Sequence, residues 1–241
     1  MSEEKAMVLF GTIVNVITII IGCLIGLFFT NIQEKYKETI MQGIGLTVIL
    51  IGLQMAFETN SMIIVLLSIL TGAAIGEFLK LEDLLNQLGE WISSKFRSKS
   101  NDTNVAQAFV TASLIFVVGA MAILGALDSG LRGDHEILVT KAMLDGFTAF
   151  VLTTTLGFGV ILSIIPVFLY QGAITIFATQ IEKWIPEVLF NEMITEITAV
   201  GGLLIVAIGL NILKLTKIRV SNLLPALMMV GVILAVYHQF I

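Results

Sequence analysis

The sequence has little of what stabilises small secreted or soluble domains: it contains one cysteine, two histidines and three prolines, and only 13% of its residues are charged. A single cysteine, Cys23, excludes a disulfide framework and a thiolate metal cluster. The two histidines, His135 and His238, are too far apart in the chain to predict a multi-histidine site. Soluble domains are about one quarter charged, so the low charge excludes disorder, nucleic-acid binding and an ordinary water-soluble core.

What the chain does have is apolar length, with 57% hydrophobic residues and 21 glycines in 241 residues. Because a transmembrane helix needs about 20 apolar residues, this predicts an all-α, polytopic transmembrane helix bundle of about eight spans. The first run is too long for a signal peptide and is interpreted as a retained span. The predicted spans are 7–29, 40–57, 61–79, 105–126, 143–163, 166–181, 198–214 and 220–240.

One junction between predicted spans lacks a polar loop. Within residues 143–181 only Ser163 and Pro166 interrupt the apolar sequence. A single straight helix over this stretch would be about 58 Å long, roughly twice the thickness of the hydrocarbon core. We therefore expect a turn or break near 163–166. The alternative is seven spans with one re-entrant segment, and short or interrupted segments of this kind are found at binding sites of transporters.

The distribution of Lys and Arg predicts an orientation. Nine of these residues lie in the loops 30–39, 80–104 and 214–219, and four lie elsewhere. The positive-inside rule then places these loops in the cytoplasm and both termini outside, in a multi-pass protein. In residues 81–97 the apolar side chains recur at helical spacing, with polar side chains on the opposite face. This pattern predicts an amphipathic helix on the cytoplasmic membrane surface.

We predict that residues 1–241 form a single membrane domain. Within it, an internal repeat relates the N-terminal spans to the C-terminal spans. A shift of 157 residues aligns the three spans of repeat one (7–79) with the three spans of repeat two (166–240) and places Gly45-Leu46 on Gly202-Leu203. The two triplets of spans start five spans apart, an odd number, so they would have opposite orientations around a central, glycine-rich helix pair at 105–165. Inverted repeats of this kind are typical of secondary transporters, and they also occur in channels.

Polar side chains inside the apolar spans are the candidate site residues, because they are costly in lipid and usually face a cavity or another helix. Four amides stand out, and they suit a neutral, zwitterionic or partly dehydrated ionic substrate. The alternative is that they only hydrogen-bond between helices as packing contacts. These amides are Asn15, Gln54, Gln171 and Asn211.

The central helix pair adds charged and hydroxyl candidates. Asp145 lies just inside the predicted fifth span, with Lys141 one turn earlier. This i,i+4 pair is either a salt bridge at the membrane edge or a proton or cation site. Asp128, Ser113 and Thr154 complete the predicted pathway, although threonines here can also bond to carbonyls of their own helix. By contrast, two glycine pairs predict close helix packing: Gly22/Gly26 and Gly72/Gly76.

The chain contains no H-E-x-x-H, G-x-S-x-G, Walker or dinucleotide motif, so no enzyme and no cofactor is predicted. The leading hypothesis is a transporter or channel for a small solute or ion, assembled as a homo-oligomer in the lipid bilayer and without a nucleic-acid partner. The alternative is a non-transporting scaffold that presents the 81–97 helix to a partner. A third class, an intramembrane enzyme acting on lipid, would require Asp128 and Asp145 to converge.

Several stretches resemble a known family. These are residues 109–125, the run from Lys141 to Gly146, the opening Gly11-Thr-Ile-Val-Asn15 and the segment from Gly72 to Glu77. They are similar to the YdfK/YqgA-like family of uncharacterised bacterial inner-membrane proteins, classed under domain of unknown function 554. The chain departs from the expected pattern at Ala120, where a proline and a helix break are expected. The resemblance implies a location in the bacterial cytoplasmic (inner) membrane and no enzymatic activity.

Overall fold

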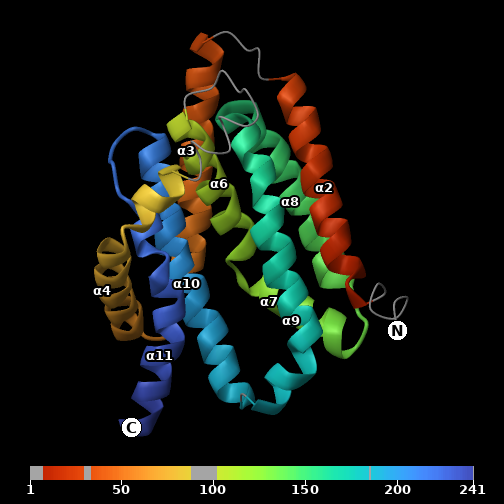
Figure 1. Ribbon diagram of the computed structural model, residues 1–241, viewed down its shortest axis with the longest axis vertical. Helices are drawn as coiled ribbons and strands as arrows, with labels where there is room; N and C mark the ends of the chain where they lie inside the picture. Colours follow the sequence, from red (N-terminus) through yellow and green to blue (C-terminus); the bar gives the residue numbers. More distant parts are fainter. Residues whose placement is uncertain (1–7, 30–33, 88–101, 185, 241) are drawn as a thin grey trace. The chain divides into compact units, whose positions relative to one another are not determined.

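The computed structural model describes residues 8–29, 34–87, 102–184 and 186–240 (Figure 1). Within these ranges the regular secondary structure is helical, without strands, so the predicted all-α class is confirmed. The chain divides into two compact units. Unit 1 comprises Met1–Gln33 and Gln107–Glu187, and unit 2 comprises Glu34–Ala106 and Val188–Ile241.

Several helices are long and apolar enough to cross a membrane. Six stretches of the described residues meet this criterion, or seven if a bent helix pair is taken as one span. The predicted count of eight is therefore not confirmed. The lower count treats Glu136–Lys183 as a single stretch of 48 residues.

Unit 1 is built on the packing of α2 (Phe10–Phe28) against α8 (Glu136–Leu156). Gly22 lies against the backbone carbonyl of Gly146, and a Cβ atom at Gly26 would come within 2.7 Å of Thr153 Cβ. The predicted close packing at Gly22 and Gly26 is confirmed. The residue numbers of the contacting positions increase in the same direction along both helices, so α2 and α8 run parallel.

The chain reverses between α8 and α9 (Ile164–Trp184). Asp145 and Gln171 both accept a hydrogen bond from Asn15 Nδ2, although 26 residues of straight helix would separate them by about 39 Å. The reversal runs through the 3-10 helix η1 (Gly157–Ser163), which begins at a glycine with φ of +78°. The predicted break near 163–166 is confirmed, a few residues earlier than expected. Consequently α9 runs antiparallel to α2 as well as to α8 (Figure 1).

The predicted span 105–126 is not one continuous helix. The chain forms two helices there, α6 (Asp102–Val117) and α7 (Ala120–Leu131), bent by 57° relative to each other. Gly119 at the bend has φ of +134°, a conformation open to glycine and rare for other residues. An apolar run indicates that a segment is buried or contacts lipid, but it does not indicate whether the segment is one continuous helix. Because α7 begins at Ala120, the break forms without a proline at this position.

Unit 2 contains α3 (Glu34–Ala56), α4 (Met62–Leu79), α10 (Glu187–Ile212), the 3-10 helix η2 (Val220–Leu223) and α11 (Pro225–Phe240). Backbones of α3 and α10 approach at glycines: Cβ atoms at Gly52 and Gly45 would lie 2.6 Å from Gly202 O and 3.3 Å from Gly209 O. The two helices are therefore antiparallel.

The second predicted glycine pair is also confirmed. In unit 2, Gly72 meets the backbone of Ala226 and Gly76 meets that of Asn222, which brings α4 against α11 and η2. After α4, residues 81–87 are helical, in agreement with the start of the predicted 81–97 amphipathic helix. Residues 88–97 lie outside the described residues.

Candidate functional site

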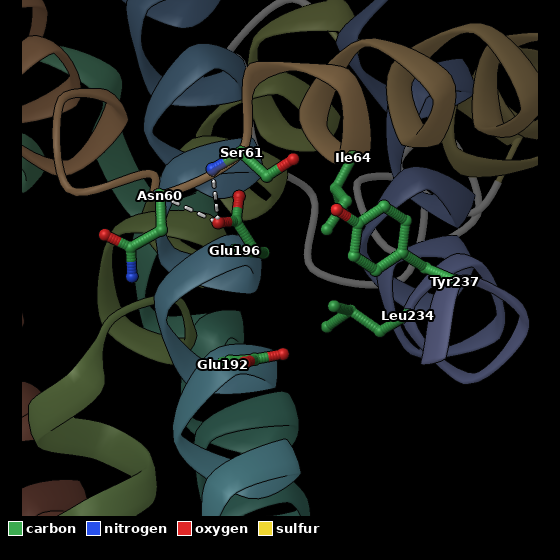
Figure 2. A pocket seen from close by; sticks show the side chains of 7 residues that line it. All are labelled: Asn60, Ser61, Ile64, Glu192, Glu196, Leu234 and Tyr237. Atoms are coloured by element: carbon green, nitrogen blue, oxygen red, sulfur yellow. Dashed lines mark hydrogen bonds between the residues drawn. The ribbon is translucent and has the colours of Figure 1, made fainter. Parts of the chain in front are cut away.

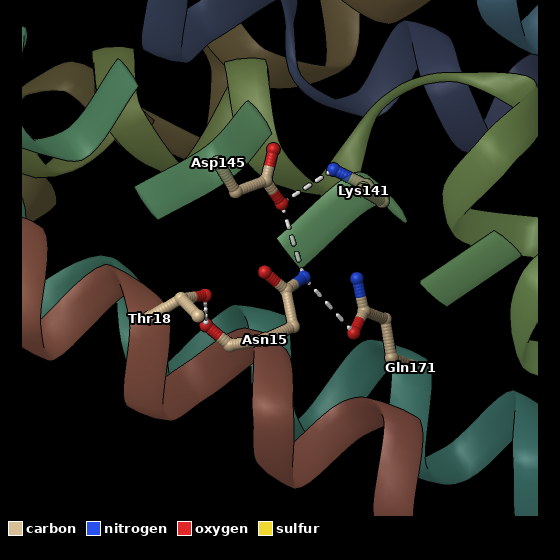
Figure 3. Close-up of polar contacts among 5 residues, drawn as sticks. All are labelled: Asn15, Thr18, Lys141, Asp145 and Gln171. Atoms are coloured by element: carbon tan, nitrogen blue, oxygen red, sulfur yellow. Dashed lines mark hydrogen bonds and ion pairs between the residues drawn. The ribbon is translucent and has the colours of Figure 1, made fainter. Parts of the chain in front are cut away.

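Four of the predicted polar residues meet within unit 1 (Figure 3). Asn15 comes from α2, Lys141 and Asp145 come from consecutive turns of α8, and Gln171 comes from α9. Asn15 and Gln171 are 0% exposed, and Lys141 and Asp145 are each 6% exposed. We call these four residues the polar cluster.

The polar cluster is organised around one carboxylate oxygen. Lys141 Nζ lies 2.6 Å from Asp145 Oδ2, and Asn15 Nδ2 donates to the same oxygen at 3.0 Å. Asn15 Nδ2 also donates to Gln171 Oε1 at 3.3 Å. Removing an ion pair from water is costly, and further hydrogen bonds are needed to offset that cost. The spacing of Lys141 and Asp145 places both on one face of α8, where Asn15 can supply such a bond.

Some polar atoms in and beside the polar cluster have no partner. Asn15 Oδ1, Gln171 Nε2 and Thr12 Oγ1 are buried without a hydrogen bond among the described residues. Such an atom costs about 1–3 kcal/mol, and buried polar atoms are usually paired. The arrangement can therefore accept a further hydrogen-bonding group. Thr12 was missed in the sequence, although it lies one helical turn before Asn15.

Three other predicted residues of the chain have different surroundings. Asp128 pairs with Arg132 at 3.3 Å, and Thr154 Oγ1 donates to Val151 O at 2.7 Å within its own helix. Ser113 Oγ on α6 is buried and unpartnered. Among the hydrogen bonds of the described residues, none of the three joins the polar cluster.

The remaining two predicted residues belong to unit 2. Asn211 closes the loop after α10: its Nδ2 donates to Ile218 O at 2.7 Å, and its Oδ1 accepts from Ile218 N at 2.9 Å and from Thr216 Oγ1 at 2.8 Å. Gln54 is exposed on α3. The hydrogen bonds of Asn211 favour a structural role in its loop.

Unit 2 has a pocket of about 190 Å³, which is smaller than the roughly 300–1,000 Å³ usual for ligand sites. Figure 2 shows Glu196 at its edge, accepting hydrogen bonds from the backbone N–H groups of Asn60 (2.9 Å) and Ser61 (3.0 Å). Thr59 Oγ1 donates to the other carboxylate oxygen at 2.6 Å. Because α4 begins at Met62, Glu196 caps this helix from α10. The pocket is lined by Asn60, Ser61, Ile64, Glu192, Glu196, Leu234 and Tyr237.

A second polar network in unit 2 lies at the end of α4. Asn222 Nδ2 donates to Glu77 Oε2 at 2.6 Å, and Arg219 pairs with the other oxygen of Glu77 at 2.7 Å. Asn222 Oδ1 accepts from the backbone N–H of Glu82 at 2.8 Å. These contacts fix the helical residues 81–87 to η2. In the described part of the chain, no group of three or more His, Cys, Asp and Glu side chains is arranged to hold a metal ion.

Comparison with known proteins agrees with the resemblance seen in the sequence. Residues 10–235 match the family model described as "Protein of unknown function (DUF554)". The chain is 35% identical over 237 residues to "Uncharacterized membrane protein YdfK" of Bacillus subtilis, covering 96% of this chain and 98% of the relative. It is 30% identical over 223 residues to "Uncharacterized protein YqgA" of Escherichia coli, covering 91% and 93%. No solved structure matches. With its apolar helices and these relatives, the chain is a membrane protein and belongs to the DUF554 family.

Proposed function

We propose that the protein is a small transporter or channel of the bacterial inner membrane, which moves a small solute or ion past the polar cluster. The observation that carries this proposal is the buried Lys141–Asp145 pair, enclosed by amides that keep unpartnered atoms. Ionisable residues inside membrane helices are costly, and they usually mark ion or substrate pathways. Contacts made only for packing would leave fewer of these atoms without partners.

The predicted inverted repeat supports a site at this position. Asn15 and Gln171 are 156 residues apart, one residue from the 157-residue offset of the repeat. Their contact therefore lies where the antiparallel helices α2 and α9 cross at equivalent positions. In transporters with inverted repeats, substrate sites lie where the two repeats meet.

The helix pair α3 and α10 of unit 2 supports the repeat independently. Gly45 packs near Gly209, and Gly52 packs near Gly202. Under the 157-residue offset, Gly45 corresponds to Gly202 and Gly52 to Gly209. Each contact is thus the counterpart of the other, as a local two-fold axis between inverted repeats requires.

Flux through proteoliposomes tests the transport proposal. We expect Asp145→Asn to abolish proton-coupled or ion-coupled flux, because the amide cannot exchange a proton or carry the charge of the carboxylate. Glu182→Gln is the matched control, since Glu182 is an exposed acid on α9 of the same unit. Wild-type flux from correctly folded Asp145→Asn protein would remove Asp145 from the mechanism.

Cysteine accessibility tests whether water reaches the polar cluster. In a Cys23→Ala background, we expect Asn15→Cys to react with a charged, membrane-impermeant thiol reagent. Ile19→Cys is the matched control, because Ile19 lies one turn later on α2 and is also 0% exposed. Protection of both cysteines would favour packing over a pathway. The predicted orientation, with both termini outside, can be tested with the same reagent on terminal cysteines.

A scaffold function is the second candidate, favoured by one observation. The start of the predicted amphipathic helix is held in place, with Glu82 bonded through its backbone to Asn222 and through its side chain to the N–H of Ser221. A fixed helix can present a docking surface. Loss of partner binding after Glu82→Ala, with flux absent from the wild-type protein, would favour the scaffold.

We do not propose an enzymatic reaction. Among the described contacts, Asp145 is paired with Lys141 and Asp128 with Arg132, so the two carboxylates that an intramembrane hydrolase would need do not form a pair.

A further inference from the structure

We propose that the polar cluster binds the carboxylate group of a small monocarboxylate anion together with one proton. This inference deepens the proposed function and rests on it, because it names the substrate class of the same site. Asp145 then acts as an internal substitute for the substrate: its carboxylate occupies the place that the substrate carboxylate takes when Asp145 is protonated.

The first argument is the excess of donors in the polar cluster. Figure 3 shows the Lys141 amine and the Asn15 amide nitrogen directed at Asp145 Oδ2. The amide group of Gln171 lies next to that of Asn15. Lys141 Nζ carries three N–H groups, and Asp145 is its acceptor among the described contacts. Gln171 Nε2 carries two more and has no acceptor. Such a set of charged and neutral donors suits a carboxylate.

The second argument is the charge of the site. The buried pair of Lys141 and Asp145 is neutral as a whole. An anion that replaces the Asp145 carboxylate beside Lys141 would leave one uncompensated negative charge, and burying such a charge is very costly. Uptake of one proton by Asp145 restores neutrality. The site can therefore fill only when an anion and a proton enter together, which is the stoichiometry of a proton–anion symporter.

The third argument favours an anion over a cation as the ligand. A cation would have to enter beside the Lys141 ammonium, and Gln171 Nε2, the unpartnered donor, cannot coordinate it. Asn15 Oδ1, a buried acceptor without a partner among the described contacts, is instead available to the O–H of a protonated Asp145.

Other titratable groups do not supply the proton site. Within unit 1, α2, α7 and η1 pack on α8, and α9 brings Gln171 to the polar cluster. Among the described contacts, none of their titratable side chains pairs with Asp145, so Lys141 is its charged partner. These side chains are Cys23 on α2, Asp128 on α7, and Tyr170, Glu182 and Lys183 on α9.

Binding of formate and acetate to the purified full chain in detergent tests the proposal, with chloride and sodium as comparison ions. We expect formate to raise the midpoint of thermal unfolding, as any ligand of the folded state does. The apparent Kd for formate should fall about tenfold for each unit of falling pH while Asp145 is ionised in the free protein. In weakly buffered solution, saturation with formate should remove one proton per bound anion, a measurement that needs no variant.

Variants separate the roles of the two charged residues. Asp145→Asn, which resembles the protonated acid, should bind formate with an affinity that no longer depends on pH. Lys141→Gln should lose formate binding. The matched controls are Glu182→Gln and Lys183→Gln, exposed residues on α9 that should leave binding unchanged.

Three results would overturn the proposal: no proton uptake with formate, formate binding retained in Lys141→Gln, or stabilisation by sodium that increases in Lys141→Gln. The last result would identify a cation site in which Lys141 is the competitor. Failure of the transport proposal gives a different outcome, namely proton-linked formate binding in detergent without flux in liposomes. Flux of another solute without formate binding would retain transport and refute only the anion.

Discussion

Among the described residues, each unit buries one carboxylate, and the two are stabilised in different ways. Asp145 of unit 1 is 6% exposed and is paired with an ammonium group and one amide. Glu196 of unit 2 is 2% exposed and accepts from two backbone N–H groups and a hydroxyl at the start of α4. Both oxygens of Glu196 have partners, whereas the surroundings of Asp145 keep unpartnered amide atoms.

This difference distinguishes a structural acid from a candidate functional one. The partners of Glu196 are two backbone N–H groups and one hydroxyl of the same short loop, so its charge stabilises one conformation of residues 59–61. The partner of Asp145 is a long side chain whose own charge must be compensated. Rearrangement of Lys141 and Asp145 can therefore be driven by a ligand or a proton without loss of a helix cap.

The largest expected effect is that of Lys141→Met. This variant leaves the Asp145 carboxylate buried without a cation and should lower the free energy of unfolding by about 3–5 kcal/mol. Adding Asp145→Asn should recover most of the loss, because the unpaired charge is then removed. Thermal or denaturant unfolding in detergent micelles measures both. Equal stabilities of the single and double variants would mean that the pair is not buried as described.

A smaller loss is expected on the other side of the comparison. Glu196→Ala removes the cap of α4 and should cost about 2 kcal/mol, whereas Glu196→Gln keeps an acceptor and should cost less. Flux per folded molecule should stay at the wild-type level in both. The control is Glu192→Gln, a partly exposed acid paired with His238, which should change stability by less than about 1 kcal/mol. A flux defect in Glu196→Gln would give this acid a functional role.

The smallest effects concern two threonines. Thr12→Val removes an unpartnered hydroxyl in unit 1 and should leave stability unchanged or raise it by up to about 1 kcal/mol. Thr59→Val removes a hydroxyl that bonds to Glu196 and to the N–H of Ser61, and it should cost about 1 kcal/mol. The same unfolding measurements apply. If Thr12→Val is the more damaging variant, Thr12 has a partner that the contacts described above do not include.

Sequence periodicity and polarity were sufficient for part of this description. Asn15, Asp145 and Gln171 could be selected because each interrupts an apolar run, and Lys141 because it lies one helical turn before Asp145. The rule that such residues are costly in lipid does not depend on the tertiary fold. Their convergence could not be derived, because it depends on the reversal through η1 and on the parallel packing of α2 on α8.

For other features, the sequence did not distinguish the role that the structure shows from other possible roles. Asn211 interrupts an apolar run just as Asn15 does, yet it bonds to the loop that follows its own helix. Glu196 lies in a polar stretch that the hydropathy pattern assigned to a loop, whereas α10 begins at Glu187 and includes it. The family resemblance predicted a helix break at position 120 through a proline that this chain lacks, and the backbone conformation of Gly119 identifies the bend.

The bend at Gly119 also has a consequence for how the protein enters the membrane. At 16 and 12 residues, α6 and α7 are about 24 Å and 18 Å long, so neither alone spans a hydrocarbon core of about 30 Å. Within unit 1, α7 packs against α8 and α9, which are synthesised after it. We therefore expect α6 and α7 to reach their final positions only after α8 and α9 have been synthesised. Placement of α6 and α7 would then be a late step of assembly.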